Sequence, residues 1–270
     1  MLVLFIGDVV GAPGKRAIAS ALPRIHSSYP IDLVIANAEN IADGKGVTPD
    51  SAKELFSLGV DVLTNGNHAW DKPEVIDYIV TEPRLLRPYN YPAGTPGSGW
   101  HVVTTQSGAK VGILNLLGNI FMSSSLSCLF KAADNALAQK PSDVNCIIVD
   151  VHAEVASEKI AMGWYLDGKV SAVVGTHTHV PTADECVLPK GTGYLTDVGM
   201  SGCYHSVVGM DINQSMRRLI DKESVPLTIA HGEGTLHAAL LELDEKTGLC
   251  VNIQRLKMRE FELTRHQLCV

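Results

Sequence analysis

Short, mostly apolar runs recur along the chain and alternate with segments of helical periodicity. Near-continuous apolar runs are typical of strands that are buried on both faces, whereas apolar residues three and four positions apart indicate one face of a helix. Because the two kinds of segment alternate, the pattern predicts an α/β fold in which helices cover a sheet. The predicted strands are Leu2–Ile6, Leu33–Ala36, Val60–Leu63, Val111–Leu116, Cys146–Val149 and Ala172–Val174, and the predicted helices are Lys15–Ile25, Asp50–Leu58, Pro73–Val80 and Leu126–Gln139.

The last part of the chain has a different pattern. Leu236–Leu243 and Cys250–Met258 flank a short Gly-containing loop, which predicts a β-hairpin. Arg84–Gly99 is rich in Pro, Gly and Tyr and predicts a loop that crosses the surface or forms a lid. The sequence holds no internal repeat and no low-complexity tract, so we expect one domain over residues 1–270 that includes the hairpin.

Composition and charge narrow the class of protein. The 270 residues are 46% hydrophobic, which is enough for a substantial core. The formal net charge is −7 without a basic run, so we expect no duplex nucleic acid as a partner, because that polyanion requires a cationic surface. A small phosphate ester held by local cations remains open.

Three features bear on location. The sequence has no run of about 18 apolar residues that would predict a membrane-spanning helix. Met1–Ile6 has no basic leader and ends at Gly7-Asp8, so it indicates a buried strand rather than a signal peptide. The cysteines lie far apart, as is typical of a reducing cytoplasm, and we expect none of them to bind a metal. They are Cys128, Cys146, Cys186, Cys203, Cys250 and Cys269.

Polar side chains follow five of the predicted strands. A single Asp or Asn after a strand is commonly a turn residue, and a single His is commonly structural. In open α/β sheets, however, ligands bind outside the carboxyl ends of the strands, so side chains at five such ends can converge. The coincidence favours a functional site. Its candidate residues are Asp8, Glu39, Asn40, Asn67, His68, His152, His177 and His179.

The donor types limit the metal. Carboxylate, amide oxygen and imidazole without thiolate suit Mn, Fe, Zn, Co or Ni better than Ca or a cysteine-based structural zinc. Seven donors are too many for one catalytic ion with an open position, and they suit two ions that share a bridging carboxylate. Such a centre carries net positive charge and fits an anionic phosphate. The seven are Asp8, Glu39, Asn40, Asn67, His152, His177 and His179.

Two phosphate-binding motifs are excluded. Residues 7–16 contain several glycines before a predicted helix, but a P-loop requires Gly at Val9 and Ser or Thr at Arg16. A dinucleotide-binding motif also requires Gly at Val9. Gly11 and Gly14 then serve a tight turn into the helix, whose N-terminus can still face the site.

At these residues the chain resembles the metallophosphoesterase superfamily. Gly7-Asp8, Gly66-Asn67-His68 and His177-Thr178-His179 correspond to three of its hallmarks. Val10 stands where the superfamily commonly has His, and Asn37-Ala38-Glu39-Asn40 stands where it commonly has a second Gly-Asp. These two departures are similar to the YmdB-like phosphodiesterases, a subfamily of that superfamily.

The resemblance to the YmdB-like group runs from Met1 to about Met258 and includes three further motifs. It implies a four-layer α/β/β/α fold, a di-iron or dimanganese site, homo-oligomers, and activity on cyclic nucleotides, chiefly the 2′,3′-cyclic ones. The further motifs are Gly66-Asn67-His68-Ala69-Trp70-Asp71, His152-Ala153-Glu154 and Thr196-Asp197-Val198-Gly199-Met200.

The resemblance also implies roles for individual residues. One ion would be bound by Asp8, Glu39, Asn40 and His179, and the other by Glu39, Asn67, His152 and His177, with Glu39 bridging. His68 would be an unligated general acid. Three positions differ from the residues expected in this group, which leaves substrate preference open. They are Ala69 in place of Thr, and Cys203 and His205 in place of Pro and Asp.

The preferred hypothesis is a dinuclear-metal phosphodiesterase that converts nucleoside 2′,3′-cyclic monophosphates into 3′-phosphates, with His68 protonating the departing 2′ oxygen. One alternative keeps the site but acts on 3′,5′-cyclic nucleotides or phosphomonoesters. Another is a non-catalytic, RNA-associated regulatory protein, although a decayed site should have lost ligands. Asp71 is a candidate for orienting His68, and Asp150 or Glu154 for supporting His152, with a helix cap or a solvated charge as the alternative for each.

Overall fold

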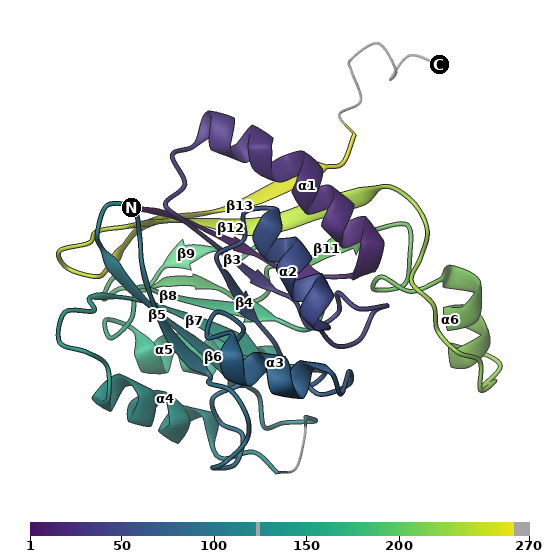
Figure 1. Cartoon of the computed structure of the whole chain (residues 1–270), viewed down its shortest axis with the longest axis horizontal. Coiled ribbons are helices and arrows are strands. Elements are labelled where there is room, and N and C mark those ends of the chain that lie inside the picture. Colours follow the sequence, from purple (N-terminus) through teal and green to yellow (C-terminus); the bar gives the residue numbers. More distant parts are fainter. Residues whose placement is uncertain (123–124, 262–270) are drawn as a thin grey trace.

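The computed structural model describes residues 1–122 and 125–261, and its strands form two mixed sheets that pack face to face (Figure 1). The first sheet has the order β2-β11-β12-β1-β3-β4, with β13 paired to β12, and the second has the order β5-β6-β7-β8-β10-β9. The first comprises β1 (Leu2–Ile6), β2 (Asp8–Val9), β3 (Leu33–Asn37), β4 (Val62–Thr64), β11 (Met200–Cys203), β12 (Gly234–Leu243) and β13 (Cys250–Arg259), and the second comprises β5 (Trp100–Thr104), β6 (Lys110–Leu117), β7 (Cys146–His152), β8 (Ala172–Thr176), β9 (Cys186–Val187) and β10 (Gly193–Leu195).

Helices cover both outer faces of the two-sheet sandwich. In Figure 1, α1 (Gly11–Ser28) and α2 (Pro49–Ser57) lie on one side, and α4 (Leu129–Ala138) and α5 (Ala156–Leu166) lie on the other. The short helix α3 (Val75–Thr81) packs into the same core as α1 and α2. Helix α6 (Ile212–Leu219) projects from the body at one end.

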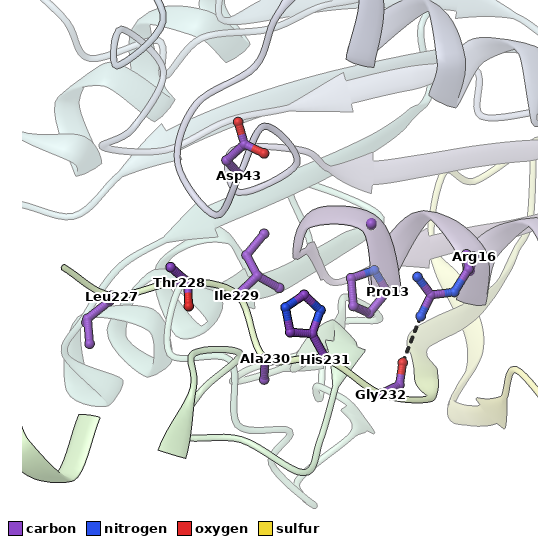
Figure 2. A pocket seen from close by; sticks show the side chains of 10 residues that line it. Pro13, Arg16, Asp43, Leu227, Thr228, Ile229, Ala230, His231 and Gly232 are labelled. Carbon is purple, nitrogen blue, oxygen red and sulfur yellow. Dashed lines mark hydrogen bonds between the residues drawn. The ribbon is translucent and has the colours of Figure 1, made fainter. Parts of the chain in front are cut away.

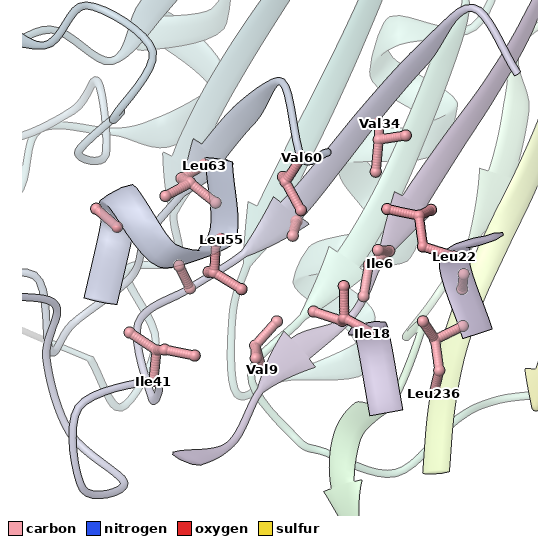
Figure 3. Packing of buried hydrophobic residues seen from close by; sticks show 14 of the residues in the cluster. Ile6, Val9, Ile18, Leu22, Val34, Ile41, Leu55, Val60, Leu63 and Leu236 are labelled. Atoms are coloured by element: carbon pink, nitrogen blue, oxygen red, sulfur yellow. The ribbon is translucent and has the colours of Figure 1, made fainter. Parts of the chain in front are cut away.

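The side chains of β1 show why the sheets stack in this way. Successive strand residues point to opposite faces, and both faces of β1 are apolar. Leu4 and Ile6 belong to the core under α1 and α2, whereas Val3 and Phe5 belong to the core between the two sheets. Figure 3 shows Ile6 within the first of these cores. Each such fully buried side chain contributes about 1.5–3 kcal/mol to folding. A third core lies between the second sheet and α4 and α5, so three cores separate four layers, and the predicted α/β/β/α fold is confirmed.

Most predicted elements are present with small boundary shifts. All six predicted strands and all four predicted helices form, and the C-terminal hairpin is β12 and β13 with an irregularity at Glu242/Leu243. Arg84–Gly99 holds no helix or strand. The sequence pattern missed α5, α6 and the short strands β2, β5, β9, β10 and β11.

Two further observations concern the cysteines and the possibility of a membrane-spanning helix. The five cysteines within the described ranges are free thiols, and Cys269 lies outside the described residues. Within those same ranges, no helix is both long enough and apolar enough to span a bilayer.

The parallel strands of both sheets bring the predicted site together. β1, β3 and β4 run parallel in the first sheet, and β6, β7 and β8 run parallel in the second. Their carboxyl ends therefore meet at one edge of the sandwich.

Candidate metal centre

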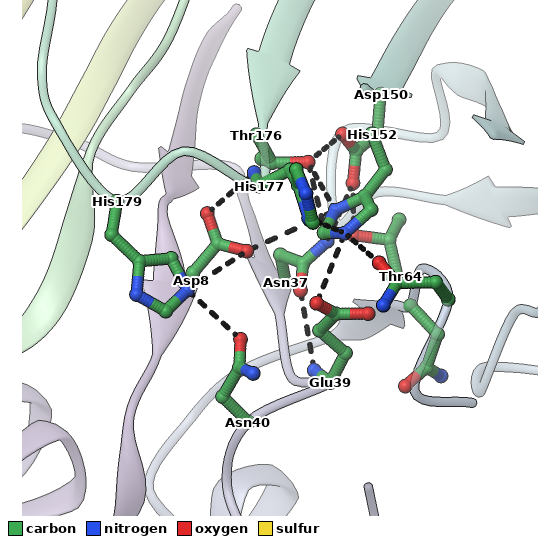
Figure 4. Close-up of polar contacts among 12 residues, drawn as sticks. Asp8, Asn37, Glu39, Asn40, Thr64, Asp150, His152, Thr176, His177 and His179 are labelled. Carbon is green, nitrogen blue, oxygen red and sulfur yellow. Dashed lines mark hydrogen bonds and ion pairs between the residues drawn. The ribbon is translucent and has the colours of Figure 1, made fainter. Parts of the chain in front are cut away.

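All seven predicted metal ligands lie at this edge, five of them 0–9% exposed and Asn67 and His177 partly buried (Figure 4). They come from both sheets, because Asp8, Glu39 and Asn67 follow β1, β3 and β4, while His152 ends β7 and His177 follows β8. The side chains form two neighbouring groups. We call Glu39, Asn67, His152 and His177 the first cluster, and Asp8, Asn40 and His179 the second cluster.

The first cluster converges on one nitrogen. The Nε2 atom of His152 lies 3.0 Å from Glu39 Oε1, 3.2 Å from Asn67 Oδ1 and 3.0 Å from His177 Nδ1. Even without Asn67, the ligand atoms of three residues lie close enough together to hold a metal ion. These residues are Glu39, His152 and His177. Three potential ligand atoms thus surround a fourth at close range.

The second cluster is looser. His179 Nε2 lies 3.2 Å from Asn40 Oδ1 and 4.0 Å from Asp8 Oδ1. Asp8 Oδ1 is also 3.8 Å from His152 Nδ1, the ring nitrogen that does not face the first cluster, and it is buried without a hydrogen-bond partner in the described part of the chain. Glu39 contacts only the first cluster directly, but its negative charge contributes to the raised pKa of Asp8.

The hydrogen bonds behind His152 leave its Nε2 free to act as a ligand. The Thr176 hydroxyl donates to Asp150 Oδ1 at 2.7 Å, so it accepts from His152 Nδ1 at 2.9 Å. Asp150 also accepts from Thr64 and from the amide of Asn37. A carboxylate behind the Nδ1 side of a ligating imidazole fixes its tautomer and raises its basicity.

The other two histidines also have one ring nitrogen occupied by an outer partner and the other directed toward a cluster. His177 Nε2 faces Glu154 Oε2 at 3.1 Å, which leaves Nδ1 toward the first cluster. His179 Nδ1 donates to the carbonyl of Val208 at 2.9 Å, which leaves Nε2 toward the second cluster. The Asn40 amide nitrogen donates to Gly44 O at 3.0 Å, so its oxygen faces His179.

In each cluster, therefore, lone pairs on neighbouring oxygen and nitrogen atoms point toward one another. Such buried acceptors repel one another unless a proton or a metal cation stands between them. Although burial disfavours a charged imidazole, the Glu39 carboxylate raises the pKa of His152 to about 9, so without another cation a proton takes this place. The residues thus fit a metal ion, which would displace that proton.

The neighbouring pKa values follow from the same arrangement. Burial raises the pKa of Asp8 to about 6. Burial also acts to raise that of Glu39, but the positive His152 outweighs it and holds the pKa at about 2. Burial and then the charge of His152 lower the pKa of His177 to about 3, so His177 keeps its lone pair. The surrounding residues thus stabilise a positive charge at His152 Nε2, whereas the imidazole of His177 stays neutral.

The His-x-His segment has a strained backbone. His177 and His179 have φ values of 96° and 65°, and a non-glycine residue in this region costs on the order of 1–3 kcal/mol. Asp197 holds the segment by accepting from the backbone N–H and the hydroxyl of Thr178, and it forms a buried ion pair of 2.6 Å with Lys159 of α5. The resemblance pointed to Asp197, but nothing in the sequence pattern pointed to Lys159.

Gly66 has a steric role at the centre. A Cβ atom there would lie 2.1–2.2 Å from the His152 ring and 2.5 Å from Glu39 Oε2. Only glycine lets the loop after β4 approach the first cluster this closely.

His68 stands beside the clusters without joining either. Its ring is 23% exposed, its Nδ1 lies 2.8 Å from Asp71 Oδ2, and its backbone N–H donates to Glu39 Oε2 at 3.1 Å. Asp71 therefore contacts His68 as expected, whereas Glu154 contacts His177 rather than His152. Asp150 supports His152, but through Thr176.

The three residues that differ from the family expectation occupy different places. Ala69 and Cys203 are each 1% exposed, and the Cys203 thiol faces the carbonyls of His205 and His231. His205 is exposed.

Sequence reasoning missed the polar residues behind His152. Asn37, Thr64 and Thr176 are the last residues of β3, β4 and β8, and all three are fully buried. The available signal was a polar residue at the end of an apolar strand, one to three residues before a candidate ligand.

A four-layer α/β/β/α sandwich with paired acceptor clusters at the carboxyl ends of its strands defines a metallophosphoesterase. Comparison with known sequences is more specific, since residues 4–256 match the family described as YmdB-like protein. The chain belongs to this family.

Three relatives span nearly the whole chain. A Bacillus subtilis (strain 168) protein named 2′,3′-cyclic-nucleotide 2′-phosphodiesterase is 43% identical over 260 residues, which is 96% of this chain and 98% of the relative. The crystal structure of a hypothetical protein from Thermus thermophilus has a TM-score of 0.89 at 43% identity, covering 96% of this chain and 99% of that one. The structure of a novel phosphatase from Mycoplasma pneumoniae has a TM-score of 0.90 at 33% identity, covering 96% of this chain and 93% of that one.

Proposed function

We propose that the chain is a metal-dependent phosphodiesterase that hydrolyses nucleoside 2′,3′-cyclic monophosphates to 3′-phosphates. The observation that carries the proposal is the pair of buried clusters whose lone pairs face one another beside the half-buried His68. The substrate class rests on the Bacillus subtilis relative, whose name states this activity.

The proposed ligands follow from the geometry and the family resemblance. The first cluster would hold one ion and the second cluster the other, with Glu39 shared between them. Manganese or iron is our choice, and zinc, cobalt and nickel suit the same donors. When bound, the ions would supply Lewis-acid stabilisation to the phosphate and activation of the attacking water.

The residues of the chain itself would handle the leaving group. Asp71 lies 2.8 Å from His68 Nδ1 and would accept its hydrogen, so in the doubly protonated imidazolium the Nε2 hydrogen is the one that can be transferred. As the water oxygen bonds to phosphorus, the bond from phosphorus to the 2′ oxygen breaks, and His68 gives its proton to that oxygen. The products are a free 2′-hydroxyl and a 3′-phosphate.

The test is turnover of 2′,3′-cyclic AMP by manganese-loaded protein, with the products separated by chromatography. We expect adenosine 3′-phosphate. A predominant 2′-phosphate would contradict the assignment of the leaving oxygen. Faster turnover of 3′,5′-cyclic AMP or of p-nitrophenyl phosphate would favour the alternative substrates, and no turnover of any of them would favour the non-catalytic alternative.

Two further properties stay predictions. The cysteine pattern predicts a cytoplasmic protein, and the family resemblance predicts a homo-oligomer. Size-exclusion chromatography coupled to light scattering measures the second directly.

A further inference from the structure

A large cavity opens next to the proposed general acid. It has a volume of about 820 Å³ and lies between α6 with the segment that follows it and two loops of the body. One of its walls includes Asp71, the hydrogen-bond partner of His68. The cavity therefore adjoins Asp71 behind His68, on the Nδ1 side of the ring.

The charges of this cavity are not balanced. Asp71 contacts His68, and Asp43 lies 3.7 Å from Lys72. Lys45 and Arg218 also line the cavity, and within the described part of the chain neither side chain has a hydrogen bond or ion pair. In a chain with a net charge of −7, two unpaired cations that face one cavity favour an anionic ligand group there.

A second cavity continues from the first. It has a volume of about 420 Å³, and the two cavities share Asp43 and Leu227 in their walls. Figure 2 shows that Pro13, Ile229 and the imidazole ring of His231 surround it. Its walls also include Arg16 and Asp43, but most of the lining residues are apolar. A largely apolar wall with one imidazole suits a nucleobase, because bases stack on flat side chains, histidine included.

We propose that these cavities bind the nucleotide upstream of the cyclic phosphate, so that the preferred substrate is an RNA 3′ end that terminates in a 2′,3′-cyclic phosphate. This inference rests on the proposed function. In this arrangement the 2′ oxygen lies at His68 Nε2, and the 5′ side of the terminal ribose extends past the His68 ring toward Asp71. Its 5′-phosphate then reaches Lys45 and Arg218, and the preceding base reaches the cavity beside His231.

The overall negative charge agrees with a short contact of this kind. Proteins that bind single strands combine cations along the backbone with stacking surfaces for the bases. Here the first cavity offers two unpaired cations, which suits one phosphate group rather than a long duplex. The chemistry required is a 2′,3′-cyclic phosphate with a 5′-linked phosphate, either as a 5′-phosphorylated mononucleotide or within an oligonucleotide.

The test compares three substrates of manganese-loaded protein. They are adenosine 2′,3′-cyclic phosphate, its 5′-phosphorylated form, and the dinucleotide ApA with a terminal 2′,3′-cyclic phosphate. We expect kcat/KM to rise about 25-fold on adding the 5′-phosphate, because two cations each contribute about fivefold and the two factors multiply. We expect a further rise for the dinucleotide, and a loss of both advantages at high salt.

Substitutions test which residues produce the advantage of the 5′-phosphate. Lys45→Ala and Arg218→Ala should each lower the ratio of kcat/KM with and without the 5′-phosphate about fivefold, whereas Lys45→Arg should keep it. Arg217→Ala is the matched control, since the Arg217 guanidinium pairs with Glu223 rather than lining the cavity. His231→Ala should lower only the additional advantage of the dinucleotide.

The outcomes separate this inference from the function on which it rests. If adenosine 2′,3′-cyclic phosphate is hydrolysed but a 5′-phosphate brings no advantage, or the advantage survives both charge removals, the inference is wrong and the proposed function stands. If the dinucleotide gains nothing over the 5′-phosphorylated mononucleotide, the RNA end is not the preferred substrate. If none of the three is hydrolysed, the proposed function itself fails.

Discussion

The two clusters of the proposed metal centre differ in how the rest of the chain supports them. In the first cluster, His152 is backed by the buried Asp150 through Thr176, and His177 is backed by Glu154. In the second cluster, the outer partners of His179 and Asn40 are the backbone carbonyls of Val208 and Gly44.

This difference has a consequence for affinity. A carboxylate behind an imidazole raises its basicity, whereas a carbonyl mainly fixes its orientation. The first cluster is also tighter, with three acceptors 3.0–3.2 Å from one nitrogen, against 3.2 and 4.0 Å around His179 Nε2. We therefore expect the first cluster to hold its ion more strongly, and the second cluster to lose its ion first to a chelator.

The largest effect should come from Glu39, the carboxylate that we propose both ions share. Glu39→Gln replaces a charge with a neutral amide at His152 Nε2 and removes a negative charge that also acts on Asp8 of the second cluster. We expect the variant to retain less than one ion per chain after manganese loading and to have only the activity of metal-free protein. Elemental analysis and turnover assays measure both. A variant that keeps one ion would show that Glu39 serves the first cluster alone.

The next largest effect should come from His68, which lies outside both clusters. His68→Ala should keep the metals and the fold but lose roughly 10²–10⁴-fold in activity on 2′,3′-cyclic nucleotides. It should lose far less on bis-(p-nitrophenyl) phosphate, because nitrophenolate departs without a proton. His152→Ala, by contrast, should lose an ion and fail on both substrates. Equal slowing of both substrates by His68→Ala, or loss of metal, would exclude His68 as the acid.

A smaller effect tests the support behind the first cluster. Asp150→Asn keeps the shape of the side chain but weakens its hold on Thr176 and hence on His152. Metal affinity of the first cluster should fall about 10–100-fold, as is usual for outer partners of ligating histidines. Competition with a chelator of known affinity measures it, and Asp134→Asn, on the exposed surface of α4, is the control. An unchanged affinity would remove Asp150 as the reason for the difference between the clusters.

The smallest effect belongs to the second cluster. Asn40→Ala removes one neutral amide oxygen, worth about 1–1.5 kcal/mol, or roughly tenfold in affinity. Only the more weakly held ion should be affected, so the second step of a chelator titration should stay where it is. If both steps shift, the two clusters are coupled and cannot be assigned separately.

The strands show how much of the fold the apolar pattern predicts. Apolar runs located all six predicted strands, yet β3, β4, β7 and β8 continue for one to three residues beyond the predicted ends. The added residues include Asn37, Thr64, His152 and Thr176, which are polar and fully buried. Periodicity cannot assign such residues to a strand, because their burial depends on partners from other strands.

Helix α5 was missed for a related reason. Its residues include Gly163, which weakens a helical pattern. The structure requires glycine there, since a Cβ atom would lie 2.5 Å from the Tyr194 ring. That contact joins α5 to β10 and is invisible in either segment alone.

The division into two sheets could not be predicted from the apolar pattern either. A strand buried on both faces does not reveal whether a helix or a second sheet covers each face. The four layers were expected only from the family resemblance. The single domain, the metal ligands and the role of His68 stay predictions.

The most direct test of the central claim is the number of ions per chain. Protein purified without a chelator, loaded with Mn²⁺ and freed of excess metal by gel filtration, should contain two ions per chain by elemental analysis. Stepwise removal should release one ion before the other. A ratio near one after full loading would contradict the two-cluster centre.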